Sequence, residues 1–115
     1  MKISLLDIAD TPEKQAWGLQ FVRHVPENTG MLFRFNYPHV LSFWMLNTYV
    51  GLDIAFIDKD NVIVKTERMI PLSTRSVTSG RPCMMALEVP GGTFKDVVGK
   101  MVKIDLNSKL VTIDD

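Results

Sequence analysis

The stretch Gly30-Met31-Leu32-Phe33-Arg34-Phe35 decides the fold class, because its aromatic and charged side chains alternate. Phe33 and Phe35 should point one way and Arg34 the other, which is the period-two pattern of a strand with one buried face. Similar short apolar runs, bounded by turn-forming residues, occur along the rest of the chain. We expect strands near 3–8, 30–35, 42–48, 54–57, 62–65, 83–89, 101–106 and 109–113.

One short helix is predicted between the first two of these strands. Thr11-Pro12-Glu13 combines a capping side chain, a proline suited to the first helical position and an acidic residue at the positive end of the dipole. Trp17 and Phe21 lie four residues apart, so we expect them on a buried helical face. Gly18 weakens the helix, which should end near residue 20.

The remaining segments predict turns and loops. Pro38 favours a turn over 36–39, and 70–82 is the longest irregular segment, as expected of a functional or mobile loop. Thr93 and Asp96 form a capping-box-like start and Gly99 a stop, which predicts a single helical turn over 93–99. Strands spaced this closely leave no room for crossover helices, which argues against a parallel α/β fold. We therefore predict a mainly β (α+β) fold: a small antiparallel, barrel-like sheet of seven or eight short strands, with one short helix and one helical turn.

Size and composition indicate one globular domain over 1–115. The chain has 115 residues, of which 46% are hydrophobic and 23% charged, and it has no repeat or linker. Thirteen basic residues balance thirteen acidic ones, which disfavours a nucleic-acid partner. The lone Cys83 cannot form an intramolecular disulfide, which fits a reducing compartment. No apolar stretch is long enough for a signal peptide or a membrane span. We therefore expect a cytosolic protein without a membrane partner, unless an export signal was trimmed; the oligomeric state is open.

Several kinds of chemistry lack a sequence signal. His24, His39 and Cys83 are far apart and show no metal-ligand spacing, so no metal is predicted. Gly91-Gly92 lacks the lysine of a phosphate-binding loop, and no cofactor is predicted. Cys83 shares its strand face with apolar residues and is interpreted as core rather than as a nucleophile.

Two carboxylates, Asp53 and Glu88, each end an otherwise apolar strand face. Partial burial there would raise the pKa of a carboxyl group, as a general acid or base requires. Three interpretations remain open. Each carboxylate could pin a neighbouring loop through backbone N–H groups, bind a ligand, or take part in acid–base catalysis.

The stretch Ser42-Phe43-Trp44-Met45-Leu46-Asn47-Thr48 lies next to the first of these carboxylates. Trp44 could form a platform for a sugar or a base, and the amide of Asn47 could supply one donor and one acceptor; a buried core tryptophan is the alternative. In a regular strand Trp44 and Thr48 would face away from Asn47. All three can join one site only if a bulge or turn near Asn47 gathers them.

The elements Gly18-Leu19-x-Phe21, Gly30-Met31-Leu32-Phe33, Trp44-Met45-x-Asn47-Thr48 and Leu52-Asp53, with further matches at 71–74 and 86–92, resemble domain of unknown function number 192. The resemblance covers about 8–105. It implies a compact β-rich domain, often exported or lipid-anchored in bacteria, and no established activity. Leu46 and Gln20 depart from the family pattern, in which a basic residue and a methionine are usual.

Three functions compete. We favour a non-catalytic module that binds a small polar ligand or a peptide, with the loop 70–82 as a lid. The second is a hydrolase-type enzyme for a polar substrate, which needs Asp53 and Glu88 within about 10 Å of each other. The third is a structural or accessory domain, which expects a buried Trp44 and no sizeable pocket. The candidate binding residues are Trp44, Asn47, Thr48, Asp53, Ser73 and Glu88.

Overall fold

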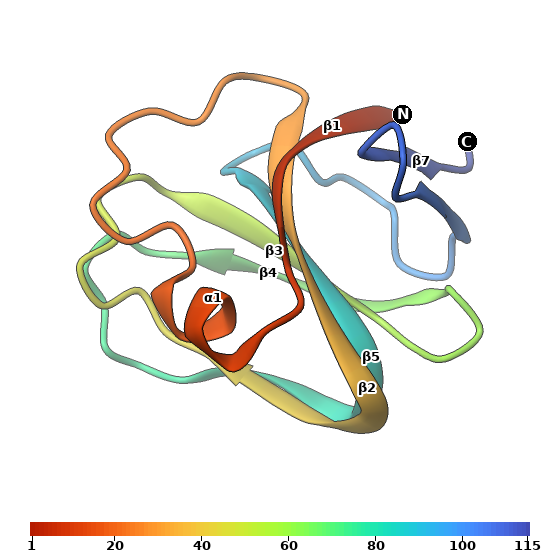
Figure 1. Cartoon of the computed structure of the whole chain (residues 1–115), viewed down its shortest axis with the longest axis horizontal. Helices are drawn as coiled ribbons and strands as arrows, with labels where there is room; N and C mark the ends of the chain where they lie inside the picture. The colour runs from red at the N-terminus through yellow and green to blue at the C-terminus, as the bar shows by residue number, and fades with distance from the viewer.

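The computed structural model describes all residues from 1 to 115 and contains one helix and a seven-stranded sheet (Figure 1). The strands follow one another in the sheet in the order β4-β3-β5-β2-β1-β7-β6. The elements are β1 Lys2–Ala9, α1 Pro12–Trp17, β2 Thr29–Phe43, β3 Leu52–Ile57, β4 Ile63–Met69, β5 Val77–Pro90, β6 Val102–Asp105 and β7 Leu110–Ile113.

The sheet rolls into a half-barrel, which confirms the predicted mainly β, barrel-like fold. A bridge between Val62 and Met101 brings together the starts of the two edge strands, β4 and β6. The sheet is mixed rather than purely antiparallel, because β1 and β2 are parallel. A parallel pair needs a long crossover connection, and the segment 10–28, which contains α1, provides it.

Two strands, β2 and β5, run through the middle of the sheet and are much longer than predicted, with 15 and 14 residues. Figure 1 shows them curving together. The predicted turn at 36–39 is wrong, since these residues lie inside β2. The pairing of β2 with β5 is interrupted between Arg34 and His39. Pro38, which cannot donate to the ladder, sits in this irregular stretch, so the strand bends there without ending.

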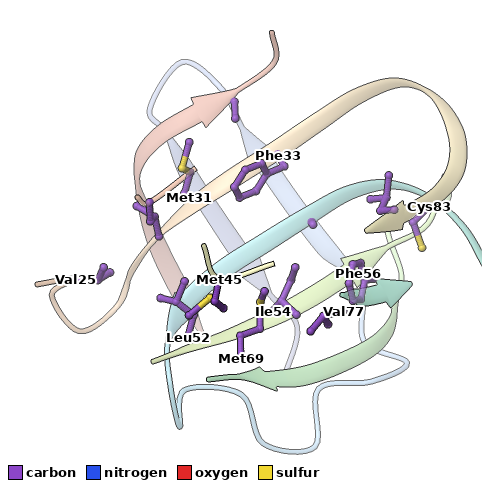
Figure 2. Packing of buried hydrophobic residues seen from close by; sticks show 14 residues of the cluster. Val25, Met31, Phe33, Met45, Leu52, Ile54, Phe56, Met69, Val77 and Cys83 are labelled. Carbon is purple, nitrogen blue, oxygen red and sulfur yellow. The ribbon is translucent and has the colours of Figure 1, made fainter. Parts of the chain in front are cut away.

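Alternate residues of the central strands build two cores on opposite faces of the sheet. The inner core has 14 buried residues, including Phe33, Ile54 and Phe56, whose side chains point into the half-barrel in Figure 2. The outer core has 12, including Leu32 and Leu87. Side chains alternate between the two faces of a strand. In β2, β3 and the second half of β5, neighbouring residues therefore pack into different cores.

The helix α1 starts as predicted and ends early. Thr11 Oγ1 accepts a hydrogen bond from Lys14 N at 3.3 Å, and Gly18, with φ 55°, ends the helix after Trp17. The predicted buried face is wrong: Trp17 is 58% exposed and Phe21 is half-exposed, because the short helix contributes no buried residue of its own. No helix of the chain is long and apolar enough to cross a bilayer.

Two further predicted segments differ from the structure. The irregular segment 70–82 is shorter than expected, since β5 already begins at Val77. No helical turn forms over 93–99. Asp96 adopts φ 53°, outside the helical region, and the N–H of Phe94 donates to Asp53 Oδ2 at 3.0 Å.

Gly30 marks a close approach of backbones that tolerates no side chain. A Cβ atom at this position would clash with the backbone oxygen of Glu88 and would lie 2.9 Å from the side chain of Val89. We expect Gly30→Ala to lower the free energy of unfolding by about 1–3 kcal/mol, as overpacking does. Gly51→Ala is the matched control, since its nearest neighbour would be 3.9 Å away. Urea denaturation measures both; equal stability of the two variants would contradict the packing described.

Candidate functional site

Glu88 lies near the end of β5, on the inner face of the half-barrel. It pairs with Met31 on β2 and with Ile54 on β3, and both of these belong to the inner core. The residue is only 4% exposed. Its sequence position therefore places a carboxyl group among apolar core residues.

The carboxyl group of Glu88 has no partner within the chain. Burial alone raises its pKa from 4.5 to about 8, with no contribution from a hydrogen bond or a neighbouring charge. Yet no side-chain polar atom in the structure is both cut off from solvent and unpaired. The carboxyl oxygens must therefore keep some contact with solvent, and they do so through the cavity that Glu88 lines.

This cavity, the Glu88 cavity, has a volume of about 270 Å³ and is walled mainly by apolar and aromatic groups. That volume is close to the lower end for small-molecule sites, which are typically apolar with a few polar groups. Its lining comes from α1 and the turn after it, from β2, from the segment 44–48 and from Glu88. The residues are Gln15, Ala16, Trp17, Gly18, Leu19, Gln20, Phe33, Phe35, Ser42, Phe43, Trp44, Met45, Leu46, Thr48 and Glu88.

A turn at Asn47 gathers the motif into this cavity. The predicted strand over 42–48 ends at Phe43. Thr48 N then donates to Met45 O at 3.1 Å, and Asn47 takes φ 53°. The chain folds back, so Trp44, Met45 and Thr48 border the same cavity. A common site for Trp44 and Thr48 required a turn near Asn47, and the structure contains that turn.

Two bulky residues with strained backbones hold this turn in place. Phe21 and Leu72 both have φ 65°, a conformation that costs a non-glycine residue about 1–3 kcal/mol. Phe21 N donates to Asn47 O at 2.8 Å, and Leu72 N donates to Thr48 O at 2.9 Å. Such strain clusters at functional sites and is kept where the surroundings enforce it.

Aromatic side chains continue from the cavity mouth over the surface. The ring of Trp17 lies 5.5 Å from that of Phe21, which lies 6.0 Å from Tyr49. Trp44, on the turn side, is 51% exposed. Large exposed apolar groups gathered around one opening are typical of binding surfaces.

Asp53 belongs to the other face of the sheet. It pairs with Val89 of the outer core, whereas Glu88 pairs with Ile54 of the inner core. Its carboxylate accepts hydrogen bonds from Arg68 Nε at 2.7 Å, Gly92 N at 2.9 Å and Phe94 N at 3.0 Å. Asp53 thus pins the loop after β5, and the sheet separates it from the Glu88 cavity.

The six predicted site residues are therefore divided. Trp44, Thr48 and Glu88 line one cavity. Asn47 lies just outside it, where Nδ2 donates to Gln20 Oε1 at 3.4 Å. Ser73 also lies outside the lining; its carbonyl accepts a hydrogen bond from Met45 N at 2.9 Å and so supports the turn. Asp53 lies on the opposite face, which is incompatible with a paired-carboxylate site.

No pattern in the sequence predicted that α1 would border the site. Trp17, Gln15 and Gln20 line the cavity, although Trp17 was predicted to be buried. The available signal was the glycine of Gly18-Leu19-x-Phe21, which ends the helix and turns the chain over the opening. No cluster of three or more His, Cys, Asp or Glu side chains could hold a metal ion.

Residues 2–104 match the family DUF192, described as "Uncharacterized ACR, COG1430". The chain belongs to this family. Two solved structures share its fold. One, from Sinorhizobium meliloti 1021, carries the description "putative transcription regulator"; it is 34% identical, with a TM-score of 0.73. The other, from Novosphingobium aromaticivorans DSM 12444, is of unknown function; it is 32% identical, with a TM-score of 0.72.

The matches cover 75% and 74% of this DUF192 chain. They span 67% of the length of the first protein and 61% of the second, so each of those chains extends well beyond the shared part. No curated protein matches the sequence. Family and fold are thus established, and any activity has to be argued from the cavity.

Proposed function

We propose that this DUF192 domain binds a small ligand in the Glu88 cavity. The observation that carries the proposal is the carboxyl group of Glu88, which is buried without a hydrogen-bond partner and borders an aromatic-walled cavity. A carboxyl group buried in this way costs free energy. Glutamine or an apolar residue would avoid most of that cost, so a ligand contact supplies a reason for its presence.

The two other functions considered have less support. A paired-carboxylate hydrolase needs Asp53 near Glu88, and the sheet separates them. A purely structural motif expects a buried Trp44, which is 51% exposed. A cavity of about 270 Å³ suits a small molecule or a single side chain of a bound peptide. The formal net charge of zero leaves a nucleic-acid partner disfavoured, and a cytosolic setting remains a prediction.

The two tryptophans can report binding to the cavity, so the ligand itself needs no label. The chain contains only Trp17 and Trp44, and both line the cavity. We expect hits from a fragment library to shift the indole N–H signals of both residues in ¹H–¹⁵N spectra. The variant Ala16→Phe should fill the opening and weaken these hits at least about tenfold, which corresponds to ~1.4 kcal/mol.

The matched control is Ser76→Phe, which adds the same ring at an exposed position outside the lining. It should leave the affinities unchanged. A library in which no compound moves the indole signals, or in which Ala16→Phe binds every hit as tightly as the parent, would contradict the proposal.

A further inference from the structure

The lining of the Glu88 cavity contains one ionisable group, and that group is acidic. Among its residues only Glu88 can carry a charge. An anionic ligand would therefore meet no cation in the cavity and would face a carboxyl group instead. A cationic ligand would meet a carboxylate with no competing partner.

Charged groups on the surrounding elements are directed elsewhere. On α1, Lys14 pairs with Asp7 at 3.4 Å, and Glu13 lies outside the lining. On β2, Arg34 pairs with Met85 and so shares the outer face with it, since Met85 packs against the outer core. None of them neutralises Glu88.

The charged groups of the other neighbouring elements are equally remote from the cavity. Asp53 on β3 is engaged with Arg68 of β4 on the outer face. His39, further along β2, stacks against Phe35 and Tyr37 and is not part of the lining. Within the lining, a charged ligand group therefore meets Glu88 as the only ionisable side chain. Outside it, the guanidinium of Arg23 lies over the ring of Tyr49, 5.4 Å from the ring centroid.

Three polar side chains of the lining donate hydrogen bonds within the chain, whereas the hydroxyl of Ser42 and the indole N–H groups of Trp17 and Trp44 have no partner there. Gln15 Nε2 donates to Arg34 O at 2.8 Å, Gln20 Nε2 donates to Ala16 O at 3.2 Å, and Thr48 Oγ1 donates to Leu46 O at 3.1 Å. Gln15 and Thr48 can still accept hydrogen bonds, as the carboxylate of Glu88 can. A ligand group that donates hydrogen bonds fits the acceptors of Glu88, Gln15 and Thr48.

Aromatic rings make up much of the remaining wall. Phe33 and Phe43 pack edge to face with centroids 5.0 Å apart, and Trp17 and Trp44 flank the opening. The faces of such rings attract cations, most of all ammonium groups that have lost part of their water. The same rings bury the apolar part of a ligand.

We propose that the ligand of the Glu88 cavity is a small organic amine, bound as its ammonium ion with the charged nitrogen on the Glu88 carboxylate and its apolar body against the aromatic wall. This inference rests on the proposed ligand-binding function and specifies the class of ligand. An ammonium ion donates hydrogen bonds and accepts none, which matches the acceptors of Glu88, Gln15 and Thr48.

Binding of an ammonium ion also requires that Glu88 be ionised. Since burial raises the pKa of this carboxyl group to about 8, the free protein holds a proton there at neutral pH and releases it when the amine binds. The affinity for an amine should therefore rise with pH, by about tenfold from pH 6 to pH 7.

The test uses amines paired with alcohols of the same skeleton: benzylamine with benzyl alcohol, and 2-phenylethylamine with 2-phenylethanol. Isothermal titration calorimetry and the indole signals report affinity for the parent and for Glu88→Gln. We expect the parent to bind each amine at least about tenfold more tightly than its alcohol at pH 8. Glu88→Gln should lose this preference and the pH dependence, while keeping its affinity for the alcohols.

Two results would overturn the amine assignment. If the alcohols bind as tightly as the amines, or if amine affinity does not change with pH, the cavity binds ligands but not as ammonium ions, and only this inference fails. If no amine binds while fragments of other classes shift the indole signals, the inference fails and the ligand-binding function stands. Near-UV circular dichroism of Glu88→Gln verifies that the variant is folded, and the pH series on the parent needs no variant.

Discussion

Raising the pH from 5 to 8 should lower the free energy of unfolding by about 3 kcal/mol, and Glu88→Gln should remove most of that dependence. The pKa of Glu88 is about 8 in the folded protein and ordinary, near 4.5, in the unfolded chain. Between these values the folded state holds a proton that the unfolded state has lost. The contribution of Glu88 to the free energy of unfolding is therefore highest below pH 4.5. It falls between pH 4.5 and pH 8 and levels off above pH 8.

Urea denaturation at pH 5, 6, 7 and 8 measures this effect in the parent and in Glu88→Gln. The pKa of the buried Cys83 thiol is also raised, mainly by burial, and the same series measured on Cys83→Ser separates its effect from that of Glu88. At pH 8 the glutamine variant should be the more stable protein. A parent whose stability is flat over the window, or a variant with the same slope, would contradict the buried and unpaired state of Glu88.

Asp53→Ala should destabilise the protein by about 2–5 kcal/mol, because each backbone donor that it leaves unpaired costs about 1–3 kcal/mol. The substitution deprives two backbone donors, Gly92 N and Phe94 N, of the acceptor that holds the loop after β5. It also leaves Arg68 without its partner. Urea denaturation at pH 7 measures the loss, and the backbone amide signals of 92 and 94 should move.

Arg68→Ala is the matched control for this prediction. The side chain of Arg68 is 57% exposed, so its ion pair with Asp53 is worth about 1 kcal/mol or less. We expect a small loss for Arg68→Ala and a large one for Asp53→Ala. Similar losses for both variants would mean that the ion pair, and not the pinned loop, is what Asp53 contributes.

Asp53 and Glu88 show what the sequence could and could not predict about the site. Each is a carboxylate at the end of an apolar strand face, so the strand pattern treats them alike. Their environments differ because the donors to Asp53 come from residues 92 and 94, about 40 positions away. No such donors reach Glu88. The difference between a structural and a functional carboxylate lies in these long-range contacts.

The fold was more predictable than the site, because alternation within a strand is a local property. The run Gly30–Phe35 and its equivalents placed most strands correctly. Long-range pairing decided the rest: β2 continues through Pro38 because β5 runs beside it on both sides of the irregular stretch. The parallel pairing of β1 with β2 likewise depends on where α1 carries the chain, which no local pattern reports.

The sequence indicated the kinds of side chain around Trp44 but did not show whether they share one site. The residues indicated an aromatic platform and polar groups, while regular strand alternation would have separated them. The positive φ of Asn47 resolves this, and asparagine is one of the few residues that adopt such a conformation readily. Its role is to form the turn that brings Trp44 and Thr48 to the cavity.

The property that distinguishes this site is the buried, unpaired carboxyl group that Glu88 presents to the cavity. The most direct test follows the ¹³C signal of the Glu88 side-chain carboxyl group as a function of pH, assigned by comparison with Glu88→Gln. We expect a midpoint of about 8, well above the ordinary value of 4.5 for a glutamate. A midpoint near 4.5 would show an ordinary solvated carboxylate and would contradict the account of the site.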